Sequence, residues 1–393
     1  MVKPCVMIVA AEPSGDILGA GLLAALRQRL GPGARFVGVG GPRMAEEGVL
    51  SPFDIGGLAI LGVFNAIRAY PLVLRRVRET ADLAVRERPD VAVLIDSWGF
   101  NLRVARRLRR VMPDLAIIKY VAPQVWATRP GRAKTLARAV DRLLSIHVFD
   151  EPFFEPTGLP VAFVGNPALA RDLSAADAAG LRARLGIAGD APVLLLLPGS
   201  RRSEIERLLP KFESAVDELL RQRPNLKVLM AVADAVAPEV IGRVKAWARP
   251  VHFVQGEADR LSAMRGATVA LACSGTVTTE LALCGAPMVV TYRLGVVTYA
   301  IVRLLIRTRF ITLFNVAAKD FVAPELVQYD CTGPKLAKAV ALRLDDPALR
   351  ARQIAAQFEA LEIMRGGIYD PIGAAADEVA RCLSTPRTKE TGG

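Results

Sequence analysis

Histidine and cysteine, the side chains that most often hold zinc and related metal ions, are scarce in this sequence. The 393 residues include two histidines, His147 and His252, and five cysteines, which form no CxxC pair. This spacing disfavours a His/Cys metal cluster and favours buried free thiols in a reducing compartment. We expect neither a bound metal nor another cofactor, although residue counts leave a carboxylate-held Mg²⁺ open.

Aromatic residues and long apolar runs are also lacking. Aromatics make up 6% of the chain and do not interleave with a basic stretch, so we expect no nucleic-acid partner. No uninterrupted apolar run reaches the ~20 residues that span a bilayer, and residues 1–16 lack a signal-peptide pattern. We therefore expect a cytoplasmic protein.

Two common nucleotide-binding fingerprints are missing as well. The chain has no GxGxxG after its first strand and no GxxxxGK[ST], which disfavours a dinucleotide enzyme and a P-loop nucleotidase. What it has is positive charge, because 51 Lys and Arg residues against 39 Asp and Glu give a net charge of +12. Such a surplus attracts anionic lipids and phosphorylated small molecules.

Short apolar stretches alternate with amphipathic stretches along the chain. The predicted strands cover residues 5–10, 35–39, 91–95, 115–121, 161–164, 193–197, 226–231, 251–254, 268–272 and 287–291. Near-continuous apolar strands between helices are typical of parallel sheets buried on both faces. The predicted fold class is α/β, with Rossmann-like, doubly wound domains at 1–165 and 166–383 and a disordered tail at 384–393.

In the second domain, two strands end in small polar residues followed by a helix. The candidate residues are Gly199, Ser200 and Arg201 in LPGSR, and Ser274, Gly275, Thr276 and Glu280 in SGTVTTE. Backbone N–H groups at such junctions, together with a guanidinium, bind phosphate oxygens. A carboxylate in the first turns of the helix, such as Glu280, can accept both hydroxyls of a ribose. The two turns predict a binding site for a nucleoside diphosphate.

In the first domain, Asp96 ends an apolar strand in the stretch LIDSWGFN. A carboxylate in that position needs partners or a chemical task. It could accept a proton from a hydroxyl nucleophile as a general base, or it could cap the following helix. The sequence alone leaves both roles open.

Two further loops of the first domain follow strands and could contact a polar substrate. The candidates are Glu12, Ser14, Gly15 and Asp16 in AAEPSGD, and Gln124 and Trp126 in YVAPQVWA. The first loop suits a tight turn with a helix cap and could also hold an acceptor. Trp126 could line a sugar pocket, or anchor the core, which is the commoner use of tryptophan.

Two stretches, residues 62–78 and 295–314, mix large apolar residues with arginine. Both are typical of segments that lie at a membrane surface, where the apolar side chains are buried and the arginines extend to the headgroups. Both are also typical of core helices with basic flanks. In a chain of this charge, the presence of two such segments favours contact with a membrane surface or with acyl chains.

Taken together, the motifs resemble the lipid-A-disaccharide synthase family. The resemblance rests on AAEPSGDILGAGL, FVGVGGPRM, LAILG, YVAPQVWA, LPGSRRSEI and SGTVTTELALCGAPMVVTYR, in matching order over residues 5–330. It implies a GT-B glycosyltransferase with two Rossmann-like domains facing across a cleft, inverting chemistry and no required metal. It implies UDP-2,3-diacylglucosamine as donor, 2,3-diacylglucosamine 1-phosphate as acceptor, and a peripheral location at the inner membrane.

The resemblance also implies roles by position. Asp96 matches the catalytic aspartate, Arg201 and Glu280 match nucleotide-binding residues, and Asn315 matches the asparagine of a Leu-Pro-Asn element on the acceptor side. Glu12, Ser14 and Asp16 match the loop after the first strand.

Three departures from the family pattern leave the acceptor open. Trp98-Gly99 replaces a Pro-Asp pair, Asn166 replaces the histidine of a His-Pro pair, and Phe314 replaces the proline of Leu-Pro-Asn. Two other functions therefore stay in view. One is a UDP-sugar 2-epimerase on the same scaffold, and the other is a non-catalytic lipid- or nucleotide-binding paralogue.

Overall fold

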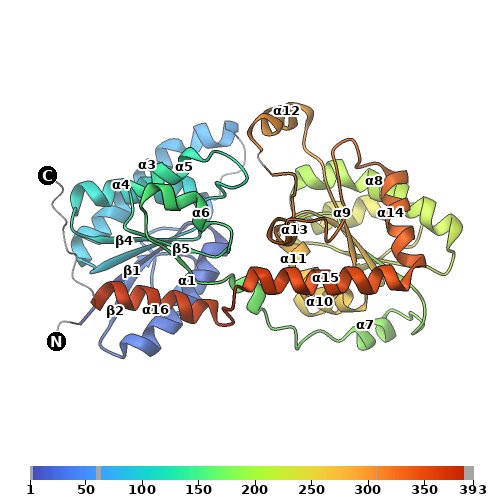
Figure 1. Cartoon of the computed structure of the whole chain (residues 1–393), viewed down its shortest axis with the longest axis horizontal. Helices are drawn as coiled ribbons and strands as arrows, with labels where there is room; N and C mark the ends of the chain where they lie inside the picture. Colours follow the sequence, from blue (N-terminus) through green and yellow to red (C-terminus); the bar gives the residue numbers. More distant parts are fainter. Residues whose placement is uncertain (1–2, 59–62, 307, 385–393) are drawn as a thin grey trace. The chain divides into compact units, whose positions relative to one another are not determined.

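The computed structural model describes residues 3–58, 63–306 and 308–384, and these residues form two compact units (Figure 1). Unit 1 combines the chain up to Pro167 with the segment that begins at Gly367. Unit 2 is the intervening segment, Ala168–Gly366. Within the described part of the chain, no helix has both the length and the apolar character needed to cross a bilayer.

Unit 1 is built on a parallel sheet of six strands in the order β2-β1-β3-β4-β5-β6. The strands are β1 (Cys5–Ala10), β2 (Arg35–Val39), β3 (Val91–Ile95), β4 (Ala116–Tyr120), β5 (Arg142–Ser145) and β6 (Val161–Phe163). The α-helices are α1 (Pro13–Leu30), α2 (Pro42–Glu46), α3 (Val63–Glu87), α4 (Trp98–Val111), α5 (Gly131–Ala137), α6 (Glu151–Phe154) and α16 (Pro371–Ser384). Short 3₁₀ turns cover Gly56–Leu58 and Glu155–Thr157, and a third, Pro167–Ala170, spans the boundary with unit 2.

Unit 2 has a second parallel sheet of six strands, in the order β12-β11-β10-β7-β8-β9. The strands are β7 (Val193–Leu197), β8 (Lys227–Ala231), β9 (His252–Val254), β10 (Val269–Cys273), β11 (Met288–Tyr292) and β12 (Glu325–Val327). The helices are α7 (Ala178–Arg184), α8 (Arg202–Gln222), α9 (Ala237–Val244), α10 (Glu257–Gly266), α11 (Thr276–Leu283), α12 (Val296–Leu305), α13 (Leu313–Ala318), α14 (Gly333–Asp345) and α15 (Pro347–Arg365), with a 3₁₀ turn at Asp234–Val236.

The central strands are buried on both faces, as their apolar sequences predict. Along β1, Met7 and Val9 join one core cluster, whereas Val6 and Ile8 join the cluster on the opposite face of the sheet. β7 divides its leucines between two clusters in the same way. Because the helices cover both faces, polar side chains of these strands can reach solvent only near the strand ends.

The strand predictions are confirmed to within one residue at each end, but two strands were missed. β5 has only four residues and β12 three, and neither short run shows a pattern that separates a strand from a loop. The first helix begins at Pro13, and proline is well suited to the first turn of a helix.

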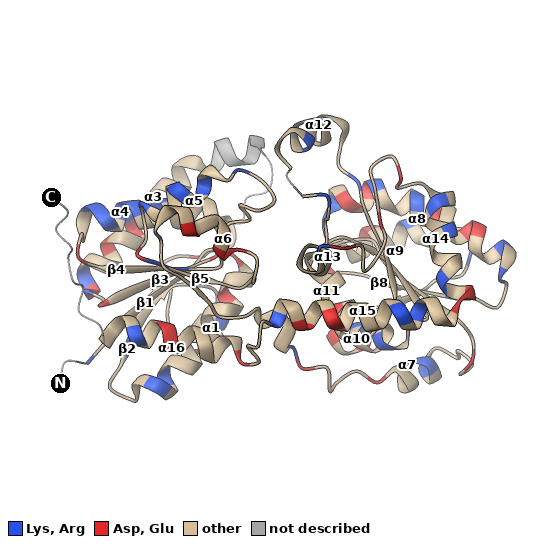
Figure 2. Cartoon of the chain, in the orientation of Figure 1, with Lys and Arg blue, Asp and Glu red and all other residues tan. Residues whose placement is uncertain are grey.

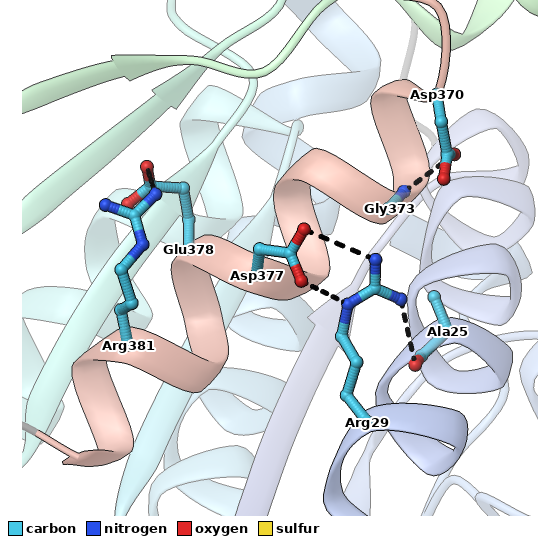
Figure 3. A network of polar contacts seen from close by, with 7 residues as sticks. All are labelled: Ala25, Arg29, Asp370, Gly373, Asp377, Glu378 and Arg381. Carbon is cyan, nitrogen blue, oxygen red and sulfur yellow. Dashed lines mark hydrogen bonds and ion pairs between the residues drawn. The ribbon is translucent and has the colours of Figure 1, made fainter.

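The C-terminal helix α16 belongs to unit 1, whereas the sequence assigned residues up to 383 to the second domain. The helix packs along α1, and the Arg29 guanidinium of α1 pairs with the Asp377 carboxylate of α16 (Figure 3). Arg142 at the start of β5 donates to Glu378 at 2.7 Å. Ala375, Ala376 and Val379 enter the same core cluster as β1, so the domain boundary drawn from the sequence differs from the contacts. Of the expected tail, 385–393 lie outside the described residues.

Ending the chain after Gly366 should destabilise unit 1 selectively. The truncation removes α16 and exposes the apolar surface of α1 and the sheet that α16 covers. We expect backbone amides of β1 and β3 to lose hydrogen-exchange protection while those of β7 and β10 keep it. A chain that ends after Ser384 is the control and should protect both sheets. Equal protection of β1 in the two chains would contradict the assignment of α16 to unit 1.

Candidate active site

A pocket of about 440 Å³ lies in unit 2 at the carboxyl ends of β7, β8 and β10. β7 and β10 are neighbours in the sheet, and the chain order reverses between them. In open parallel sheets, ligands bind at such a reversal point. The pocket is lined by Leu197, Gly199, Ser200, Arg201, Glu204, Ala231, Val232, Ala233, Asp234, Gly256, Glu257, Arg260, Cys273, Ser274, Gly275, Thr276 and Val277.

Three helices begin at this pocket. The residues that precede α8, α10 and α11 are Arg201, Gly256 and Gly275, and all three line the pocket. First-turn N–H groups have no acceptor within their own helix, and the helix dipole adds partial positive charge. The convergence of three helix N-termini favours the binding of an anion in this pocket. Gly199 has φ +110°, a conformation that other residues rarely adopt, so the LPGSR turn requires glycine.

Glu204 is a pocket residue that the sequence reasoning missed. Its Oε2 accepts the N–H groups of Ser200 and Arg201 at 3.2 and 3.3 Å, and its Oε1 accepts from the Arg201 guanidinium at 2.9 Å. This last bond raises the pKa of Arg201. The N–H groups of Ser200 and Arg201 that were expected to face phosphate therefore bond to Glu204 in this structure. A glutamate at the third helical position is a known capping signal, and it could have identified Glu204.

Glu280 lies behind the pocket and does not line it. Its two carboxylate oxygens pair with Arg171 and Arg260, and Arg171 also pairs with Glu257. Of the two arginines, Arg260 lines the pocket. The structure therefore assigns Glu280 the task of holding Arg260, a second cation that sequence reasoning missed. The ribose contact expected of Glu280 stays a prediction.

The second predicted turn is only partly available to a ligand. Ser274 donates its N–H to the Thr291 carbonyl at 3.0 Å and its hydroxyl to the Ile311 carbonyl at 3.2 Å. The expectation that the Ser274 N–H points to phosphate is thus wrong, because it extends the β10–β11 ladder. Gly275 and Thr276 remain at the pocket as the start of α11.

In unit 1, Asp96 and Ser97 follow β3 in left-handed backbone conformations, with φ +48° and +40°. Such conformations are costly for residues other than glycine and persist only where neighbours hold them. Fully buried Asn101 donates to the carbonyl oxygens of Ile95 at 2.6 Å and Asp96 at 3.1 Å. The Asp96 side chain does not cap α4: Ser97 occupies the cap position and makes no side-chain cap bond. The capping role is therefore disfavoured.

Lys119 on β4 holds the same turn and was not found from the sequence. It is 3% exposed, and its ammonium donates to the carbonyl oxygens of Asp96 at 2.6 Å, Tyr120 at 3.0 Å and Leu94 at 3.3 Å. Burial lowers the pKa of Lys119 from 10.5 to about 7, and the charges of Asp96 and Glu12 partly oppose that effect. A lysine in an apolar strand, AIIKY, is the sequence signal that could have revealed it.

The loop after β1 divides into a structural part and an exposed part. The Asp16 carboxylate is buried and accepts the N–H groups of Gly41 at 2.7 Å, Arg43 at 2.9 Å and Met44 at 3.1 Å. It thus caps α2, and contact of Asp16 with an acceptor stays a prediction that this geometry does not support. Glu12 is half-buried and Ser14 is exposed at the start of α1, where both remain candidates. Gly15 is buried.

The remaining candidate residues for sugar or acceptor binding differ in how far they are exposed. Asn315 is fully buried, and its amide bonds to Ala323 and to Glu325. Its contact with sugar stays a prediction that these bonds do not support. Gln124 is exposed and stays a candidate. Trp126 is half-buried and packs edge-on against Phe149 with ring centroids 5.2 Å apart, which agrees with an anchoring role.

The two arginine-rich apolar stretches are only partly on the surface. Residues 59–62, which include most of LAILG and the start of the stretch 62–78, lie outside the described residues, as does residue 307. In the second stretch, Phe310, Thr312 and Phe314 are buried and belong to the interior of unit 2. Val296 and Leu304 of α12 are more than 80% exposed. In the second stretch, the most exposed apolar side chains are therefore those of α12. Figure 2 shows how charged residues are distributed over the helices.

Solved structures of similar fold include enzymes whose titles name UDP or a UDP-sugar. The chain matches a co-structure of S. aureus MnaA with UDP (TM-score 0.65, 13% identity, 96% and 95% of the two chains) and a UDP-GlcNAc 2-epimerase from Neisseria meningitidis bound to UDP-GlcNAc (0.61, 12%, 97% and 99%). At these identities the likeness concerns fold, and it defines the chain as GT-B-like. Within residues 3–58, 63–306 and 308–384, no group of three or more His, Cys, Asp or Glu side chains could hold a metal ion.

Sequence comparison identifies the family. The model of the family described as lipid-A-disaccharide synthetase matches residues 6–369. The lipid-A-disaccharide synthase of Rhodospirillum centenum is 41% identical over 96% of this chain and 94% of its own, and that of Paramagnetospirillum magneticum is 40% identical over 98% and 100%. The chain belongs to the lipid-A-disaccharide synthase family, and it is a glycosyltransferase of lipid A biosynthesis.

Replacing Lys119 by Met should change how stability depends on pH. Because the pKa of Lys119 is lower in the folded than in the unfolded chain, the unfolded chain binds more protons between pH 7 and 10.5. The unfolding free energy of the wild type should therefore rise across this window, relative to that of Lys119→Met, by up to about 5 kcal/mol. Urea unfolding of unit 1 at several pH values measures this difference. The control is Lys134→Met at an exposed position, whose unfolding free energy should depend on pH as that of the wild type does. If the curves of Lys119→Met and the wild type ran parallel, the lowered pKa of Lys119 would be refuted.

Proposed function

We propose that the pocket of unit 2 binds the UDP part of UDP-2,3-diacylglucosamine, and that unit 1 supplies the base for attack by 2,3-diacylglucosamine 1-phosphate. The observation that carries this proposal is the convergence of three helix N-termini with Arg201 and Arg260 on one pocket. Helix N-termini and guanidiniums are the groups that bind pyrophosphate most effectively. Family membership favours this reaction over epimerisation, since the likeness to epimerases lies in the fold.

Departure of UDP is the demanding step, because negative charge grows on the β-phosphate as the bond to the sugar breaks. Donors fixed in place stabilise this charge more in the transition state than in the ground state. Arg260 suits this role because Glu280 holds it from behind. Arg201 has Glu204 as its partner and can exchange that carboxylate for phosphate, since its side chain is 58% exposed.

Asp96 is the proposed general base. Its carboxylate would take the proton of the acceptor's 6-hydroxyl while that oxygen attacks the anomeric carbon from the side opposite UDP. The glycosidic bond forms as the bond to the β-phosphate breaks, and the anomeric configuration inverts. Lys119 and Asn101 are positioning residues, because they hold the strained turn that presents Asp96. Trp98-Gly99 leaves no second acid in this stretch.

We also propose a cytoplasmic location at the face of the inner membrane, where both substrates have their acyl chains. The positive charge of the chain and the exposed apolar residues of α12 support contact with an anionic membrane surface. In the stretch 62–78, exposed Tyr70 is compatible with the same contact.

Asp96→Asn should remove turnover and leave UDP binding intact. The amide keeps the size of the side chain but cannot accept a proton at neutral pH, and general-base catalysis contributes roughly a hundredfold to ten-thousandfold. Purified protein is incubated with the diacylated UDP-sugar and the acylated acceptor, and UDP and disaccharide are quantified by mass spectrometry. Asp82→Asn, an exposed position on α3, should keep full activity. Undiminished turnover of Asp96→Asn would remove Asp96 from this role, and no disaccharide from the wild type would refute the proposed function.

Arg201→Ala should weaken UDP binding by about ten- to a hundredfold, the range for losing one charge-assisted hydrogen bond. Titration calorimetry with UDP measures the change. Arg202→Ala is a close control, because Arg202 is the next residue, does not line the pocket and pairs with Glu239 at 3.0 Å. Equal losses in the two variants would show a general charge effect and not a phosphate contact.

A further inference from the structure

A second pocket in unit 2 lies at the start of α12 and has a volume of about 240 Å³. It shares no lining residue with the pocket at β7 and β10. This volume is below the about 300–1,000 Å³ of pockets that enclose a whole drug-sized ligand, and it suits a small group such as a phosphate. The lining residues are Arg207, Arg293, Leu294, Gly295, Val296, Tyr299, Gln328 and Tyr329.

The pocket is positively charged. It is lined by two arginines and no acidic residue, and neither arginine has an ion-pair partner among the described residues. Arg207 donates one N–H to the Ser203 carbonyl of its own helix at 2.7 Å, and Arg293 contacts the carbonyls of Gln328 and Cys331 at 3.4 Å. A guanidinium has five N–H donors, so both retain capacity for an anion.

The backbone at the pocket brings the two arginines to the start of α12. The Arg207 guanidinium lies beside Gly295, where an added Cβ would be 3.4 Å from it, in ordinary van der Waals contact. The Gln328 side chain accepts the Leu294 N–H at 2.6 Å and fixes the loop that follows Arg293. α12 also directs its unpaired first-turn N–H groups toward its N-terminal end.

Exposed aliphatic side chains and two tyrosines surround the pocket. Val296 at its edge is 81% exposed, and Leu304 at the other end of α12 is 87% exposed. Tyr299 and Tyr329 stand edge-to-face at 6.1 Å beside the arginines. Tyrosines with a wet end and an apolar end, next to exposed aliphatic residues and cations, are typical of a protein surface at the headgroup level of a membrane.

We propose that Arg207 and Arg293 bind the headgroup phosphate of an anionic membrane phospholipid, with the acyl chains lying against α12. The exposed apolar helix favours a lipid over a free anion, since a free phosphate gains nothing from Leu304. This inference rests on the proposed membrane location, and it adds a defined lipid site to it that is separate from the substrate pocket.

The test is binding of the full chain to vesicles by flotation. Wild type should bind vesicles of phosphatidylcholine containing phosphatidylglycerol, and bind phosphatidylcholine vesicles weakly. The double variant Arg207→Gln/Arg293→Gln should bind the anionic vesicles about thirtyfold more weakly. Arg221→Gln/Arg352→Gln removes the same charge from exposed positions of unit 2 and should bind like the wild type. Leu304→Ser should also weaken vesicle binding.

Two further measurements separate the possible outcomes. Calorimetry should give the wild-type affinity for UDP in Arg207→Gln/Arg293→Gln. That affinity would show that unit 2 of the variant is folded and that its loss of vesicle binding does not come from the proposed reaction site. Arg207→Lys/Arg293→Lys should restore most of the vesicle binding because it keeps the charge. Equal losses in the two glutamine variants would overturn the proposal as a general charge effect. Unchanged vesicle binding together with lost binding of inorganic phosphate would overturn it in favour of a free-anion site.

Discussion

Burial of the central strands on both faces confines polar chemistry to one edge of each sheet. β1, β3, β7 and β10 have apolar side chains on both faces, and their polar successors appear only where the strands end. Since all strands of a sheet are parallel, these ends gather, and the helices that follow begin there. The pocket at β7 and β10 in unit 2 and the Asp96 turn of unit 1 are thus two results of one packing constraint.

The constraint acts together with electrostatics in different ways in the two units. In unit 2, carboxylates orient cations: Glu280 pairs with Arg260, and Glu204 pairs with Arg201. In unit 1, a cation orients a strained backbone, because the buried Lys119 ammonium is satisfied by three carbonyl oxygens. Both arrangements fix functional groups before substrate arrives, which reduces the reorganisation required during reaction.

Local signals explain what the sequence could predict. The strands, most helices and the LPGSR turn follow from apolar runs, glycine and capping residues, which act over a few positions. Hydrogen-bond and ion-pair partners that lie far apart in the sequence could not be predicted from it. The Asp16 carboxylate bonds to the start of α2, 25 residues away, and Arg171 pairs with Glu280, 109 residues away. Asn315 looks like an exposed polar residue in its motif, yet the fold uses its amide inside the core.

The return of α16 to unit 1 makes unit 2 an insertion within unit 1. A ribosome releases unit 2 in full once residue 366 has emerged, so its sheet can close while synthesis continues. The first sheet, although translated earlier, keeps an uncovered apolar surface on and around α1 until α16 arrives. The half of the molecule made first is therefore completed last, and it is the half exposed for longer to aggregation and to chaperones.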